Sequence, residues 1–311
     1  MTDGVFSAAV VIQFFRQKHC PLRQQITRHG HIKIFVVDPR SKLQFLPRIK
    51  IPPEKTDPYR GMPALQLSGQ QKKISAGIDL LKKRIRQIRP DALLLGEVWE
   101  DASNKESYGP RRRYFVDGEL DSPMNYPFRT AIINFMRKID DGRGFKDTVM
   151  SIVENYPPQV MACTMNLLGT HDTSRILTAM IDDFQGDRYA KANRRLTRTQ
   201  WVTALDRLHA ATVLQYTLPG APSIYYGDEA GMEGYGDPFC RRPFPWGREE
   251  RELQNHYRRL GQLRKKYKAL RLGDIQFQQA LNNQLSFTRT YKEQTIRVYV
   301  NRGSDDWEIP V

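Results

Sequence analysis

The sequence has few cysteines, no long hydrophobic run and no recognisable export signal. Its three cysteines, Cys20, Cys163 and Cys240, lie far apart and match no disulfide or metal-binding spacing, which favours a reducing compartment. No apolar stretch reaches the ~18 residues that a membrane span needs. The apolar run at 5–15 is short and follows Asp3 instead of basic residues, unlike a secretory signal. We therefore expect a cytoplasmic globular protein with no membrane partner.

Acidic residues are scarce in one long segment, residues 8–77. It holds 13 Lys and Arg against three acidic residues, so it carries an excess of 10 within a net charge of +15. The segment also contains seven of the 19 prolines and shows no sustained period of 3.6 or two. Because the charge is confined to it and no aromatic residues alternate with the basic ones, we do not expect a nucleic-acid partner. Nucleic-acid binding through this segment, which would be steeply salt-dependent, is the weakest of three hypotheses.

Between residues 78 and 271, segments with helical spacing alternate with short apolar runs. The spacing predicts helices at 78–88, 128–136, 145–156, 201–214 and 253–267, and strands at 92–95, 165–169 and 221–226. Strands that alternate with helices of this length imply parallel βα units. The sequence therefore predicts an α/β domain over 78–271.

After Gly273 the apolar period changes to two. Apolar residues alternate at 285–291, where Arg289 interrupts the apolar face, and more regularly at 296–300. Period two is typical of antiparallel strands that pack on one face. We assign 272–311 to the start of a small antiparallel β domain, and 1–77 to a separate, anomalous basic segment.

Two acidic motifs follow predicted strands. Gly96-Glu97-Val98-Trp99 ends the apolar run at 92–95, and His171-Asp172 follows the strand at 165–169. Parallel barrels present catalytic side chains at the carboxyl ends of their strands. Each motif alone is weak, because a Glu after a strand is more often a solvated cap, a His-Asp pair is more often structural, and Trp99 could pack in a core.

Aromatic residues are dense between residues 220 and 246. Such residues can either stack on the apolar faces of sugars or pack together in a core. The residues are Tyr225, Tyr226, Tyr235, Phe244 and Trp246.

Taken in order, three motifs resemble the α-amylase family of glycoside hydrolases, family thirteen. They are LLLGEVWED (93–101), LLGTHDTSR (167–175) and IYYGDEAGM (224–232). The runs ELDSPMNYPFR (119–129) and DPFCRRPFPW (237–246) are similar to the neopullulanase, cyclomaltodextrinase and maltogenic amylase branch. The resemblance implies a (β/α)8 barrel, in which the strands before Glu97, Asp172 and Tyr226 are the fifth, seventh and eighth.

The resemblance also implies a reaction and residue roles. The reaction is retaining hydrolysis of α-glucosidic bonds in maltodextrins, cyclodextrins or pullulan. Glu97 would be the general acid and base, Asp172 would stabilise the transition state, and His171, Trp99 and Tyr226 would bind the glucan. No metal or other cofactor is predicted, a calcium requirement does not follow from the sequence, and a homodimer is possible by resemblance.

The sequence departs from the family pattern where the nucleophile should lie. The family carries Arg-x-Asp on the strand before the helix at 78–88, but residues 67–77 contain no acidic residue, and Asp79 fits a helix start. At the N-terminus, residues 3–7 resemble the end of the third strand, yet Ala8 replaces the expected histidine. We find no nucleophile.

The resemblance stops after residue 7 and resumes near Asp79. We hypothesise that residues 8–77 are translated from a shifted reading frame between two compensating indels. Translating the coding DNA of this segment in the other two frames tests the hypothesis. If neither frame gives an apolar strand with an Arg-x-Asp motif, the hypothesis fails. The expected fold is accordingly an incomplete (β/α)8 barrel with a truncated β domain. The expected activity is absent or impaired, and a non-catalytic carbohydrate-binding relative is the alternative.

Overall fold

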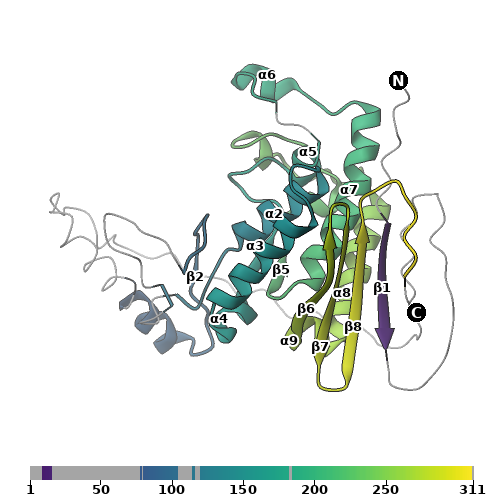
Figure 1. Ribbon diagram of the computed structural model, residues 1–311. Coiled ribbons are helices and arrows are strands. Elements are labelled where there is room, and N and C mark those ends of the chain that lie inside the picture. The colour runs from purple at the N-terminus through teal and green to yellow at the C-terminus, as the bar shows by residue number, and fades with distance from the viewer. Residues whose placement is uncertain are drawn as a thin grey trace, which may run out of the picture.

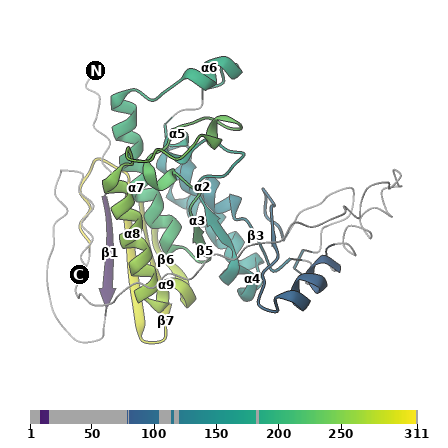
Figure 2. The same cartoon turned by 180° about the vertical axis from the view of Figure 1, so that it is seen from behind.

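The structure is a computed structural model that describes residues 9–15, 78, 80–103, 114–115, 120–181 and 184–309 (Figure 1). In this part of the chain, helices alternate with short parallel strands, and a four-stranded antiparallel sheet lies against the helices (Figure 2). No helix within these ranges is long and apolar enough to cross a membrane.

The helices follow the predicted apolar spacing. Residues 80–88 are helical, and the remaining α-helices of the described part are α2 (Tyr126–Met136), α3 (Gly142–Asn155), α4 (Pro158–Cys163), α5 (Ile176–Ala179), α6 (Arg188–Asn193), α7 (Arg198–Thr217), α8 (Arg251–Lys266) and α9 (Lys268–Leu272). Side chains satisfy the free amides at several starts: Asn125 accepts from Phe128, and Thr197 and Gln200 form a capping box. The four long helices predicted after residue 120 are confirmed.

Four short strands form a parallel series in chain order. β2 (Leu95–Gly96) pairs with β3 (Ser122–Pro123), and β4 (Met165–Leu167) pairs with β5 (Ala221–Ser223). Directly after β3, Met124 forms a parallel bridge to Met165, which joins the two pairs. Since the carboxyl ends of parallel strands share one edge, the loops after β2 and β4 leave the series on the same side.

The first strand differs from its prediction. We expected a buried strand over 92–95, but β2 begins at Leu95, and Leu93 and Leu95 are 61% and 38% exposed. Among the described residues β2 is paired along one edge only, which leaves these side chains uncovered. The strand expected over 221–226 is also shorter and ends at Ser223.

The antiparallel sheet has the order β1-β8-β7-β6. Its strands are β1 (Ala9–Phe15), β6 (Asp274–Leu281), β7 (Gln284–Tyr291) and β8 (Gln294–Asn301). Tight two-residue turns join β6 to β7 and β7 to β8, and Asn282 and Lys292 take positive φ values of 37° and 53° there. The antiparallel strands predicted from the period-two pattern are confirmed.

β1 is the described part of the basic segment. Residues 8–77 show no sustained period, yet Ala9–Phe15 pairs along its whole length with β8, from Ala9 opposite Asn301 to Phe15 opposite Thr295. Its run AVVIQFF is rich in β-branched and aromatic residues, which favour strands. The edge of β8 offers unpaired backbone groups that such a run can satisfy. Residues 3–7 and 16–77 lie outside the described residues.

A buried arginine joins the sheet to the helices. The Arg289 side chain does not interrupt the apolar face of β7; it is 1% exposed and donates to the carbonyls of Gly273 and Thr217. These carbonyls lie at the C-terminal ends of α9 and α7, where helix carbonyls have no intrahelical partner. Arg264 and Arg302 donate to other carbonyls near helix ends in the same way.

Candidate active site

Glu97 follows β2, and one of its oxygens is held by two donors. Glu97 Oε1 accepts hydrogen bonds from the Tyr126 hydroxyl at 2.9 Å and from Trp99 Nε1 at 3.1 Å. The rings of Trp99 and Tyr126 stack with centroids 4.5 Å apart and an interplanar angle of 11°. Among the described residues, nothing hydrogen-bonds Oε2. The arrangement fixes the orientation of the carboxylate through Oε1.

His171 and Asp172 lie in the loop after β4, and the side chain of Asp172 is held on both oxygens. Oδ2 lies 3.2 Å from His171 Nε2, and Oδ1 lies 3.0 Å from Nη2 of Arg241. Arg241 also donates to the carbonyl of His171 at 2.9 Å and contacts Asp237 at 2.8 Å. One arginine therefore ties this loop to the segment after β5.

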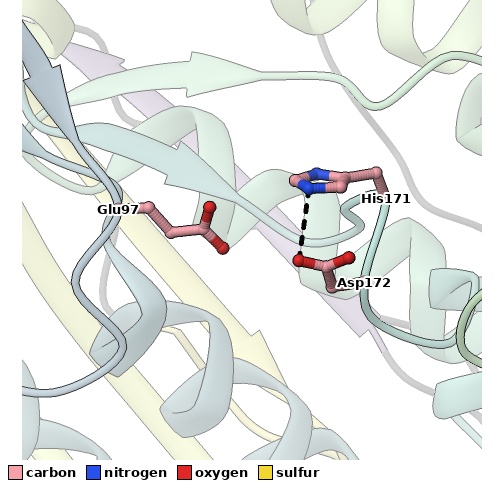
Figure 3. Close-up of side chains that lie close together, drawn as sticks. All are labelled: Glu97, His171 and Asp172. Carbon is pink, nitrogen blue, oxygen red and sulfur yellow. Dashed lines mark ion pairs between the residues drawn. The ribbon is translucent and has the colours of Figure 1, made fainter. Parts of the chain in front are cut away.

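The fold brings Glu97, His171 and Asp172 together, although more than 70 residues separate the first from the other two. One ligand atom from each lies within 4.8 Å of the others, and all three side chains are exposed. In Figure 3 the carboxylate of Glu97 points toward the His171–Asp172 pair. The sequence placed these residues on one face, and the structure has them at one point.

The two aromatic side chains that we predicted to bind the glucan are exposed. Trp99 is 51% exposed, which excludes the alternative that it is a core residue, and Tyr226 is 41% exposed. The Tyr226 hydroxyl donates to the carbonyl of Arg242 at 2.8 Å, and its ring lies 4.8 Å from that of Tyr225. Both predicted residues thus offer ring surface, and Trp99 does so beside Glu97.

A buried ion pair joins the segment after β4 to the segment after β5. Arg175 is fully buried, contacts Asp228 at 3.2 Å and lies over the rings of Tyr225 and Tyr226. Burial raises the pKa of Asp228 to about 7, and the positive charge of Arg175 opposes this rise. A Cβ on Gly169 would lie 2.1 Å from Asp228 Oδ2, so only glycine fits between the loop after β4 and this carboxyl group.

Sequence reasoning missed four residues of this environment. Tyr126, Arg241, Arg175 and Asp228 all lie within the motifs that carried the family resemblance, but nothing in their spacing assigns them a partner. The pairs Tyr126–Glu97, Arg241–Asp172 and Arg175–Asp228 join residues between 29 and 69 positions apart along the chain, and only the fold brings them together.

The three clustered side chains offer the atoms that a divalent cation would use. Two carboxylates and an imidazole are possible ligands, but the guanidinium of Arg241 already occupies Asp172 Oδ1 and adds positive charge there. The expectation of no metal cofactor therefore stays a prediction. Residues 67–77 and Asp79, where the nucleophile was sought, lie outside the described residues.

Comparison with known proteins decides the family. The family model "Alpha amylase, catalytic domain" matches residues 66–251. The chain belongs to the α-amylase family. The predicted family is thereby confirmed, and the match begins 13 residues before Asp79, so it includes the segment in which we found no nucleophile.

Individual relatives show which members of the α-amylase family this chain is similar to. It is 33% identical over 235 residues to a cyclomaltodextrinase from Geobacillus thermopakistaniensis, covering 74% of this chain and 35% of that protein. It is 35% identical over 245 residues to an amylopullulanase from Thermoanaerobacter thermohydrosulfuricus, covering 70% and 15%. The chain thus spans about a third or less of the length of these relatives.

A solved structure supports the fold. The debranching enzyme of Nostoc punctiforme, soaked with acarbose, matches with a TM-score of 0.57 and 28% identity, over 71% of this chain and 44% of that one. The structural neighbours are (β/α)8 enzymes of the α-amylase family, so the consecutive parallel strands β2 to β5 belong to that fold.

Proposed function

We propose that this chain carries the acid–base half of a retaining α-glucan hydrolase site and is catalytically impaired because its nucleophile is missing. The observation that supports this most is the convergence of Glu97, His171 and Asp172 within 4.8 Å at one edge of the parallel strands. The names of the relatives, cyclomaltodextrinase and amylopullulanase, favour maltodextrins, cyclodextrins and pullulan as substrates.

In this proposal Glu97 handles the proton. A retaining glycosidase needs one carboxyl group that protonates the leaving oxygen and then takes a proton from the attacking water. Glu97 Oε2 suits this role, because Oε1 is occupied by Tyr126 and Trp99 while no residue that the structure describes hydrogen-bonds Oε2.

Asp172 acts in the proposal as a stabiliser of positive charge, assisted by His171. A nucleophile needs a free oxygen aimed at the anomeric carbon, whereas both oxygens of Asp172 are engaged, by His171 and Arg241. A carboxylate held in this way can still stabilise the oxocarbenium-like transition state through its charge. Trp99 and Tyr226 offer exposed ring faces on which glucose units could stack.

The attacking carboxylate is the missing part. Residues 67–77 contain no acidic residue, so no covalent glycosyl intermediate can form at the position the family uses. Loss of a covalent nucleophile removes roughly three or more orders of magnitude in rate. We expect the chain to bind maltotetraose while releasing almost no reducing sugar from cyclodextrin or pullulan.

Rescue by azide separates an impaired enzyme from a pure binding protein. With α-maltosyl fluoride, azide would attack the anomeric carbon from the face opposite the fluorine, forming a C–N bond, breaking the C–F bond and releasing fluoride and β-maltosyl azide. Appearance of this product supports the impaired-enzyme proposal. Maltotetraose binding without azide product supports the alternative, a non-catalytic glucan-binding relative.

Hydrolysis of a glucan by the chain in the absence of azide would overturn the proposed impairment. The deciding result is sustained release of reducing sugar from β-cyclodextrin that Glu97→Gln abolishes. If the chain binds neither maltotetraose nor cyclodextrin in calorimetry, the proposal of a glucan site fails altogether.

A further inference from the structure

Tyr126 makes an unusual set of contacts for the first residue of a helix. Its side chain is 2% exposed, its ring stacks on Trp99, and its hydroxyl donates to Glu97 Oε1 at 2.9 Å. Burial raises the pKa of Tyr126 to about 12, so the phenol keeps its proton at neutral pH. It therefore remains a hydrogen-bond donor throughout the working range of an enzyme.

The hydroxyl lies close to the second loop of the candidate site as well. Burial raises the pKa of Tyr126, while Thr170, the residue directly before His171, lowers it through its side chain. Thr170 is itself buried and receives the backbone amide of Asp172 on its hydroxyl at 3.2 Å. Tyr126 is therefore bonded to Glu97 and lies near the loop that carries Asp172.

The hydroxyl is not needed to start α2. Asn125 caps that helix by accepting from the amide of Phe128, and Pro127 occupies a first-turn position that favours helix initiation. The ring alone supplies the packing on Trp99. What the hydroxyl adds is a hydrogen-bond donor for Glu97, which belongs to the candidate site.

We propose that Tyr126 is a positioning residue that orients the carboxyl group of Glu97. In this orientation Oε2 is the oxygen that exchanges a proton with the glycosidic oxygen of the substrate. This rests on the proposed function. The Tyr126 hydroxyl and Trp99 Nε1 bind the same oxygen, and together they stop the carboxylate from rotating about its terminal bond. Hydrogen bonds to a charged group are strong enough to hold such an orientation.

The inference can be tested by binding alone, without turnover. In acarbose a secondary amine replaces a glycosidic oxygen, so its protonated nitrogen reports on the carboxylate that faces the scissile position. Maltotetraose has oxygen there and lacks the charge. The ratio of the two affinities therefore measures how well Glu97 is placed, while maltotetraose affinity alone measures the glucan site.

We expect Tyr126→Phe to keep maltotetraose affinity within about twofold and to lower the acarbose-to-maltotetraose affinity ratio about tenfold, as loss of one hydrogen bond to a charged group implies. Glu97→Gln should lower the ratio at least as far. The matched control is Tyr156→Phe, which removes another buried hydroxyl, one that accepts from the amide of Ala102 at 2.9 Å, and should leave the ratio unchanged.

The outcomes separate the two proposals. An unchanged ratio in Tyr126→Phe, with a lowered ratio in Glu97→Gln, overturns the role of Tyr126 and leaves the glucan site standing. An equal drop in Tyr156→Phe also overturns it. If the unaltered chain binds neither sugar, the glucan site fails and this inference falls with it. Should Tyr126→Phe not fold, Trp99→Phe removes the second donor to Oε1, and an unchanged ratio there overturns the inference.

Discussion

Lowering the pH from 7.5 to 5 should remove about 2 kcal/mol from the free energy of unfolding through one side chain, His256. His256 lies in α8, is 1% exposed and shares a hydrogen bond of 2.8 Å with Thr212 of α7. Burial, with the nearby positive potential of His209 and Arg259, lowers the pKa of His256 to about 3 from an ordinary value of 6.5.

The sign follows from where the proton binds. The unfolded chain takes up a proton on this histidine near pH 6.5, whereas the folded chain resists it down to about pH 3. The stabilising effect of the neutral ring is therefore complete above pH 6.5 and is lost as the pH falls toward 3. Each pH unit in that window costs about 1.4 kcal/mol, which gives about 2 kcal/mol at pH 5.

Urea unfolding at pH 7.5, 6 and 5 measures the effect, with His256→Gln as the comparison. Glutamine keeps a polar group near the position of Nε2 and cannot take up a proton. The variant should be less stable at pH 7.5 but should lose about 2 kcal/mol less than the parent between pH 7.5 and 5. Titration of carboxyl groups affects both proteins alike. Parallel losses in the two proteins would refute the reasoning.

Two further predictions concern stability. Arg289→Ala leaves two buried helix-end carbonyls without a donor and should cost about 3 kcal/mol or more in urea unfolding, whereas exposed Lys265→Ala should change it by less than about 0.5 kcal/mol. Equal effects would contradict this role of Arg289. Gly169→Ala forces a Cβ against the carboxyl group of Asp228 and should lower the melting temperature, while Gly261→Ala, with open space in α8, should raise stability by about 0.5–1 kcal/mol.

Much of the fold follows from apolar period alone. The long helices after residue 120 and the antiparallel strands after residue 273 were predictable, because a helix or strand that buries one face must repeat its apolar residues at 3.6 or two. Period cannot report what covers a face. Leu93 and Leu95 read as buried but are exposed, and Arg289 read as an interruption but is buried.

The candidate site divides in the same way. Residue type and position after a strand predicted Glu97, His171 and Asp172, because all carboxyl ends of parallel strands meet at one edge. The sequence by itself thus determined the family, the reaction class it implies and the lack of an acidic residue in 67–77.

Only the tertiary structure decided how those side chains are held. The bond of Tyr126 to Glu97, the contact of Arg241 with Asp172, and the pairing of Ala9–Phe15 with β8 all join residues far apart along the chain. A hydrogen bond depends on two atoms meeting at about 3 Å with the right direction. That condition depends on how separate elements pack, and it leaves no periodic trace in the sequence.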